Sequence, residues 1–181
     1  RKLELSGVLS EALNIPSDEA ISRIDYSHHV QNKSKKTRKK TRRKLSNLIS
    51  SVSRGSHSSS SRKSVNLPSY HITDLADYES DIPPRFLVSQ PDAEALGGSY
   101  AREGDILVAR VGRNLSRKVV LVKKGPILIT DCFFALTPNA ASDEVLRLLT
   151  SDSGRAQLDK ISQGVGARFI TAARLLDLEL D

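Results

Sequence analysis

The chain has 181 residues and a formal net charge of +7, and 38% of its residues are hydrophobic. This length predicts one domain with an appendage and suffices to bury a core. No apolar run approaches the roughly 18 residues of a membrane span, no secretory leader is visible, and the single Cys excludes an internal disulfide and a cysteine-cluster metal site. We expect a cytoplasmic protein without membrane contact. Because Met is absent even from position 1, we also expect a processed product or a piece of a longer chain.

Residues 1–32 form an N-terminal lead-in that we expect to be partly helical. Apolar residues at positions 9, 13 and 15 precede the segment 16–19, "PSDE". A Ser cap followed by acidic residues in the first turn is typical of a helix start.

A basic block follows at residues 33–44, "KSKKTRKKTRRK", in which nine of twelve residues are basic and none is acidic. Removing these nine charges from +7 leaves −2, so the rest of the chain is nearly neutral. Such a block binds polyanions with little sequence preference. It is either a solvated linker or an arm that contacts phosphates. The candidate phosphate contacts of the arm are Lys35, Lys36, Arg38, Lys39, Lys40, Arg42 and Arg43.

The next segment has helical periodicity. Leu45, Leu48, Ile49 and Val52 are spaced i, i+3, i+4, i+7, which predicts an amphipathic helix that stops at Gly55. A polar loop of low complexity, "SHSSSSRKS", follows at residues 56–64.

Strand signals dominate from residue 66 onward. The segment 70–75, "YHITDL", predicts a short strand and a polar turn. The segment 104–113, "GDILVARVGR", predicts a Gly-Asp turn and a strand at 106–109. The apolar runs 119–122 and 127–129 flank a Gly-Pro turn and predict a hairpin. The run "CFFAL" at 132–136 predicts a strand buried on both faces, with Cys132 as a small buried hydrophobe.

After Pro138 the period becomes helical. We expect a helix that opens at residues 142–144, a second near 155–161, a short third helix capped by Thr171, and a last strand at 178–180. Strands followed by helices predict an α+β fold, which we expect to contain a mixed, mainly antiparallel sheet with peripheral helices.

Motifs for catalysis or metal binding are missing from the sequence. His28 and His29 are adjacent and would poorly share one ion, while His57 and His71 lie in separate segments. No Ser occupies a Gly-x-Ser-x-Gly elbow, and the Gly-rich segment at 164–166 is not a phosphate-binding motif. We therefore expect no catalytic residue, no metal site and no cofactor in this chain.

Basic side chains outside the block gather in loops and at strand ends. Arg can fork to guanine, and Asn or Gln can pair with adenine, in the major groove. For any single residue, solvated surface is the alternative interpretation. The candidate DNA contacts are Arg54, Arg62, Lys63, Arg85, Arg110, Arg113, Asn114, Arg117, Lys118, Gln163 and Arg168.

The order of several segments resembles a known family. These segments are "SRIDYSHHV" at 22–30, "KLSNLISSVSRG" at 44–55 with "YHITDL" after it, "REGDILVARVGR" at 102–113, and "ITDCFFALTP" at 129–138 with the closing half at 144–180. In this order they are similar to the target recognition domain of type I restriction-modification DNA specificity subunits and the equivalent domain of adenine-N6 DNA methyltransferases. The resemblance covers roughly 43–180. A whole specificity subunit has two recognition domains separated by long helices, whereas this chain has room for one such domain and shows no counterpart of the helical spacer.

The resemblance implies a non-catalytic module that recognises a sequence in double-stranded DNA. It would direct a DNA methyltransferase subunit or domain, and in some systems a restriction subunit, to that sequence as part of defence against foreign DNA. S-adenosylmethionine would be bound by the partner or by a missing domain. The implied division is a lead-in at 1–32, a basic linker at 33–44 and the recognition domain at 45–181.

Three other interpretations stay open at this point. The chain could bind nucleic acid non-specifically through the basic block alone. It could instead be a protein-interaction module whose helices at 45–52 and 144–161 dock a partner. A small enzyme of unrecognised type is disfavoured, because no acid–base or nucleophile constellation assembles.

Overall fold

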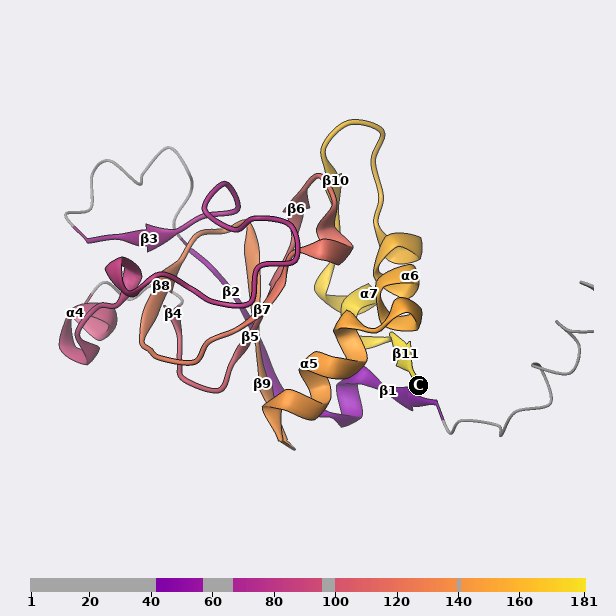
Figure 1. The fold of residues 1–181 in the computed structure, drawn as a ribbon, viewed down its shortest axis with the longest axis horizontal. Coiled ribbons are helices and arrows are strands. Elements are labelled where there is room, and N and C mark those ends of the chain that lie inside the picture. Colours follow the sequence, from indigo (N-terminus) through magenta and orange to yellow (C-terminus); the bar gives the residue numbers. More distant parts are fainter. Residues whose placement is uncertain (1–41, 57–66, 96–99, 140) are drawn as a thin grey trace, which may run out of the picture. The chain divides into compact units, whose positions relative to one another are not determined.

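The structure, a computed structural model, describes residues 42–56, 67–95, 100–139 and 141–181, all within one unit of the chain (Figure 1). Strands and helices alternate irregularly along it. The strands are β1 (Arg43–Lys44), β2 (Ile49–Arg54), β3 (Ser69–Tyr70), β4 (Tyr100–Ala101), β5 (Ile106–Ala109), β6 (Val111–Gly112), β7 (Val119–Leu121), β8 (Ile127–Ile129), β9 (Phe133–Pro138), β10 (Arg168–Phe169) and β11 (Glu179–Leu180). The helices are α4 (Gln90–Ala95), α5 (Ser142–Thr150), α6 (Asp152–Ile161) and α7 (Ala172–Leu176), with single 3-10 turns η1 (Leu45–Asn47), η3 (Pro84–Phe86) and η4 (Leu115–Arg117).

The main sheet has the strand order β2-β9-β5-β7, with every pair antiparallel. All four residues of β5 and the first four of β9 are buried, which confirms the expected strand at 106–109 and the doubly buried strand near 132–136. Such burial explains why both segments are continuously apolar. Before β5, the Asp105 carboxylate accepts hydrogen bonds from the Arg102 backbone N–H (2.8 Å) and the Thr137 hydroxyl (2.9 Å). The Gly-Asp turn is thereby tied to β9.

A second, three-stranded sheet has the order β3-β8-β4. Strand β3 runs parallel to β8, and β4 runs antiparallel to it. The Tyr70 ring joins the two sheets, because it stacks on Phe133 with ring centroids 5.5 Å apart. The predicted hairpin at 119–129 is therefore wrong: β7 pairs with β5 and β8 with β3 and β4. Both apolar runs form strands, but the Gly-Pro turn carries the chain from one sheet to the other.

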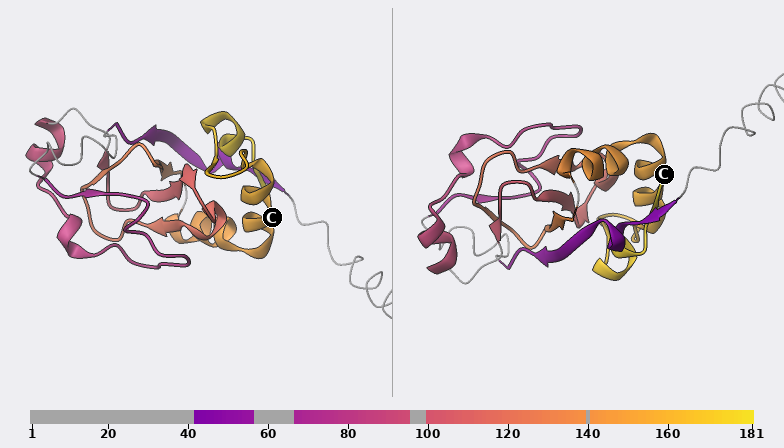
Figure 2. Two further views of the ribbon diagram at one scale, coloured as in Figure 1. Left: turned by 90° about the horizontal axis from the view of Figure 1, so that it is seen from above. Right: turned by 90° about the horizontal axis from the view of Figure 1, so that it is seen from below.

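The helices of the C-terminal third follow the sequence prediction. Helix α5 buries Val145, Leu148 and Leu149 on one face, and the Thr171 hydroxyl caps α7 by accepting from the Arg174 N–H. Strand β11 pairs with β1, and β10 pairs with β6. Figures 1 and 2 place α5, α6 and α7 at one end of the unit and α4 with the three-stranded sheet at the other. The fold is α+β with mainly antiparallel sheets, as expected.

Two local predictions are corrected. Residues 45–52 do not form a helix, because the single turn η1 passes directly into strand β2, which pairs with β9. Leu45, Leu48 and Ile49 have helical spacing because all three are buried around that one turn. The Ser-rich residues that follow the turn are extended because they pair with β9. Cys132 is half-buried in the turn before β9 rather than within a strand.

Candidate nucleic-acid interface

Polar and basic side chains collect at one end of the main sheet. The strand register places the end of β2, the end of β5, and the starts of β9 and β7 at this same end. Arg54, Arg110 and Lys118 leave the sheet here, and β6 and η4 continue directly from β5. Strand β10 joins this end by pairing Arg168 with Gly112.

A hollow of about 420 Å³ lies at this end of the sheet. It lies between the η4 region and the segment that joins α6 to β10. Three guanidinium groups share it with one carboxylate, so it favours anions. Four of its residues are DNA contacts predicted from the sequence. It is lined by Arg113, Asn114, Ser116, Arg117, Asp159, Val165, Gly166 and Arg168, and we call it the arginine hollow.

The three arginines of the hollow differ in how they are paired. Arg168 lies 3.9 Å from Asp159, and Arg117 lies 3.6 Å from Asp77. Exposed pairs of this kind contribute about 0–1 kcal/mol, so a phosphate can displace the carboxylates at little cost. The exposed Arg113 guanidinium has neither a hydrogen-bond nor an ion-pair partner within the described ranges. A ligand could therefore bind Arg113 without displacing a hydrogen bond or an ion pair of the described residues.

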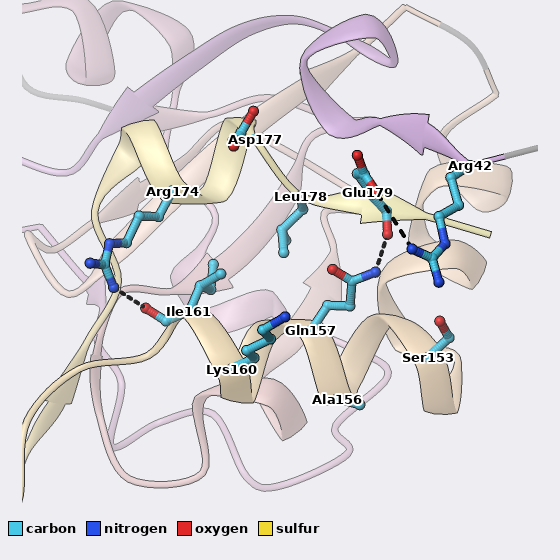
Figure 3. Close-up of a pocket in the computed structure, with 10 residues that line it drawn as sticks. All are labelled: Arg42, Ser153, Ala156, Gln157, Lys160, Ile161, Arg174, Asp177, Leu178 and Glu179. Atoms are coloured by element: carbon cyan, nitrogen blue, oxygen red, sulfur yellow. Dashed lines mark hydrogen bonds and ion pairs between the residues drawn. The ribbon is translucent and has the colours of Figure 1, made fainter.

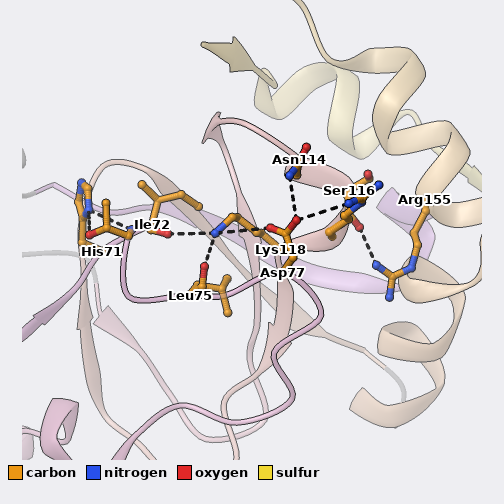
Figure 4. Close-up of polar contacts among 10 residues, drawn as sticks. His71, Ile72, Leu75, Asp77, Asn114, Ser116, Lys118 and Arg155 are labelled. Carbon is orange, nitrogen blue, oxygen red and sulfur yellow. Dashed lines mark hydrogen bonds and ion pairs between the residues drawn. The ribbon is translucent and has the colours of Figure 1, made fainter. Parts of the chain in front are cut away.

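Asp77 organises the wall of the hollow (Figure 4). Its carboxylate accepts a hydrogen bond from the Asn114 amide at 2.8 Å and lies 3.8 Å from the Lys118 ammonium. Lys118 also donates to the backbone carbonyls of Ile72 and Leu75, and its side chain is only 15% exposed. Lys118 thus ties the segment after β3 to the start of β7, and its charge is used within the fold.

A second cluster surrounds Asp131 in the turn before β9. Arg110 Nε donates to the Asp131 carbonyl at 2.7 Å, and Arg54 lies 3.6 Å from the Asp131 carboxylate. Burial, and to a lesser degree Arg54, lowers the pKa of Arg110. Burial and the Asp131 charge raise the pKa of the Cys132 thiol, whose sulfur lies 3.6 Å from His71 Nε2. A thiol held neutral in this way is a poor nucleophile.

The remaining predicted contacts are placed elsewhere. Arg85 lies over the Phe86 ring at 4.8 Å in η3. The Gln163 carboxamide oxygen, in the orientation that satisfies both side chains, accepts from Arg174 at 2.8 and 2.9 Å. Arg43 in β1 is 2.5 Å from Glu144, and Arg42 is 3.6 Å from Glu179. The other predictions lie outside the described residues, and they are Lys35, Lys36, Arg38, Lys39, Lys40, Arg62 and Lys63.

Sequence reasoning missed several residues of this site. Ser116, Asp159 and Val165 line the hollow, and Asp77 holds its wall. The "GVG" segment at 164–166 was visible but does not match a phosphate-binding motif. Asp77 and Asp159 could not be predicted from the sequence, because no local pattern marks their partners. Asp77 pairs with Arg117, forty residues later, and Asp159 pairs with Arg168, nine residues later.

A larger hollow of about 610 Å³ lies beside α6, α7 and β11 (Figure 3). Three cations and two acids line it, with Arg42 paired to Glu179 and the Gln157 amide donating to the Glu179 carbonyl. Its excess of positive charge is therefore smaller than that of the arginine hollow, where three cations meet one acid. In the part of the chain that the structure describes, no group of three or more His, Cys, Asp or Glu side chains could hold a metal ion. No helix there has the length and apolar character to cross a membrane.

Comparison with known proteins finds weak similarity to a solved structure but no match to a family model or a curated sequence. No family model matches the sequence, and no curated protein matches it significantly. Among solved structures, the S subunit of a type I restriction-modification system from M. genitalium matches with a TM-score of 0.46 and 14% identity, over 77% of this chain and 33% of that chain. The chain thus spans about a third of that structure's length. At this TM-score and identity, the match assigns neither a family nor a role to this chain.

Proposed function

We propose that this chain is a non-catalytic module that recognises a short sequence in double-stranded DNA and directs a DNA methyltransferase, with or without a restriction subunit, to that sequence. The observation that carries the proposal is the arginine hollow, in which the exposed Arg113 has no partner among the described residues. The resemblance of 102–113 and 144–180 to target recognition domains supports the assignment to restriction-modification.

The chemistry of the hollow suits base recognition as well as phosphate binding. An unpaired guanidinium can fork to O6 and N7 of guanine in the major groove. Asn114 gives one amide hydrogen to Asp77, which fixes the side chain while its oxygen and second amide hydrogen stay able to pair with adenine. Arg117 and Arg168 line the same hollow with weak ion pairs and suit the flanking phosphates.

The basic segment before the folded unit has a separate role in this proposal. Its charges at 33–40 would add affinity that depends on salt but not on sequence. Arg43 and Lys44 belong to the fold instead, since they form β1 and pair with Glu144 and Asp177. S-adenosylmethionine would be bound by the methyltransferase partner or domain.

The test is a binding selection of the full chain on a random duplex library at two salt concentrations. We expect one short motif to be enriched at both. Arg113→Ala should cost about 1–3 kcal/mol on the selected duplex and relax the preference at one base pair. Lys124→Ala is the matched control, because it removes one exposed charge at the opposite end of β7 and should leave the motif unchanged.

A second set of variants separates this proposal from non-specific binding through the basic block. Neutralising Lys35, Lys36, Arg38, Lys39 and Lys40 leaves β1 intact. If these residues neutralise about five phosphates, the log–log salt slope should become shallower by roughly 4.5 while the selected motif persists. Loss of all binding would favour the basic block alone. Absence of salt-dependent binding by the unaltered chain would favour a protein-interaction module.

A further inference from the structure

The segment that joins α6 to β10 forms a braced loop beside the arginine hollow. Its base is closed by two backbone hydrogen bonds, from Gln163 N–H to the Phe169 carbonyl (2.9 Å) and from Phe169 N–H to the Gln163 carbonyl (2.8 Å). Strand β10 pairs with β6, and Ile170 N–H donates to the Arg110 carbonyl at 2.8 Å. Figure 1 shows this loop rising beside β6 at the top of the view. The loop is thus tied to the backbone that also carries Arg113.

Val165 at the loop tip is an apolar side chain that the protein does not cover. It is fully exposed, although it lines the same hollow as Arg113, Arg117 and Arg168. The preceding Gly164 has φ +107, and a Cβ there would come within 2.7 Å of the Ala167 carbonyl oxygen. The turn that presents Val165 therefore requires glycine at position 164.

We propose that Val165 contacts the 5-methyl group of a thymine in the major groove. This inference rests on the proposed function of the hollow as a DNA-contacting site. Thymine presents a methyl group in that groove, and recognition of this methyl depends on apolar contact. The branched valine side chain is too short to wedge between base pairs but can cover one methyl. Arginines on the same hollow would hold the adjacent phosphates or a neighbouring guanine, which fixes the depth of the tip.

Replacing thymine by uracil removes only this methyl group, so it gives a direct test. The probe is the duplex selected by the full chain, resynthesised with uracil in place of one thymine at a time. We expect the dissociation constant of the unaltered protein to rise about fourfold at one position, because burial of one methyl contributes about 0.8 kcal/mol. Uracil at the other thymines should have little effect.

A mutant cycle assigns the methyl contact to this side chain. Val165→Ala should bind the thymine duplex about fourfold more weakly and lose its sensitivity to uracil at that position. Val165→Thr, which keeps the shape and one methyl, should retain part of the sensitivity, and Lys124→Ala should retain all of it. If a motif is selected but Val165→Ala keeps full sensitivity to uracil, the inference is wrong while the proposed function stands. If no motif is selected, both are wrong.

Discussion

Lys118 and Arg113 lie five residues apart at the same end of the same sheet, yet their charges are used in opposite ways. The Lys118 ammonium is nearly enclosed and donates to the carbonyls of Ile72 and Leu75 beside Asp77. Arg113 is exposed and unpaired among the described residues. Lys118 holds the wall of the hollow, and Arg113 lines the hollow. A cluster of basic residues therefore contains both paired and unpaired members, and the hydrogen bonds of each side chain tell them apart.

The largest expected effect concerns stability. Lys118→Met keeps the length of the aliphatic stem but removes the donor to two carbonyls and one of the cations paired with Asp77. The free energy of unfolding should fall by about 3 kcal/mol, measured by urea denaturation. Lys124→Met is the control, because that exposed side chain should change stability by less than about 0.5 kcal/mol. Unchanged stability of Lys118→Met would contradict the structural role of this lysine.

The second effect concerns discrimination between bases. Arg113→Lys keeps the charge and loses the planar fork. Discrimination at one base pair should fall by about 1–3 kcal/mol, while the salt slope and the free energy of unfolding stay unchanged. Competition binding with single-base variants of the selected duplex measures this loss. Retained discrimination would show that Arg113 contacts only phosphate.

Tyr70 extends the comparison to a buried polar group. Its hydroxyl is fully buried and unpaired among the described residues, and burial raises the pKa of Tyr70. In the unfolded chain the phenol ionises near pH 10, so its ionisation there favours unfolding and stability falls as the pH rises above about 10. Tyr70→Phe should raise the free energy of unfolding by about 1 kcal/mol at neutral pH and reduce the alkaline loss. Tyr78→Phe, at an exposed ring, should do neither.

The smallest effect concerns Arg117. Its side chain is about half exposed, and Asp77 keeps Asn114 and Lys118 as partners, so Arg117→Ala should leave stability nearly unchanged. If Arg117 contacts one phosphate, affinity should fall by less than about 1 kcal/mol and the log–log salt slope should become shallower by about 0.9. Arg147→Ala, on the exposed side of α5, should leave both unchanged. A changed base preference in Arg117→Ala would instead indicate a base contact.

The C-terminal third shows where local sequence signals suffice. The helical spacing of Val145, Leu148 and Leu149 and the Thr171 cap match α5 and α7, because these helices form from contacts within a few residues. Residues 45–52 show where such signals fail. Three buried apolar side chains at helical spacing fit a single turn equally well, and the pairing of β2 with β9, about eighty residues away, decided the rest.

The candidate site divides in the same way. The sequence by itself determined which segments are apolar strands and which loops carry Arg113, Asn114, Arg117 and Arg168, since composition and turn residues are local properties. Only the tertiary structure decided that these four residues line one hollow. It also decided that the Lys118 ammonium donates to backbone carbonyls and that Val165 is exposed to solvent. The physical reason is that burial and charge pairing depend on neighbours distant in the chain, such as Asp77 and Asp159.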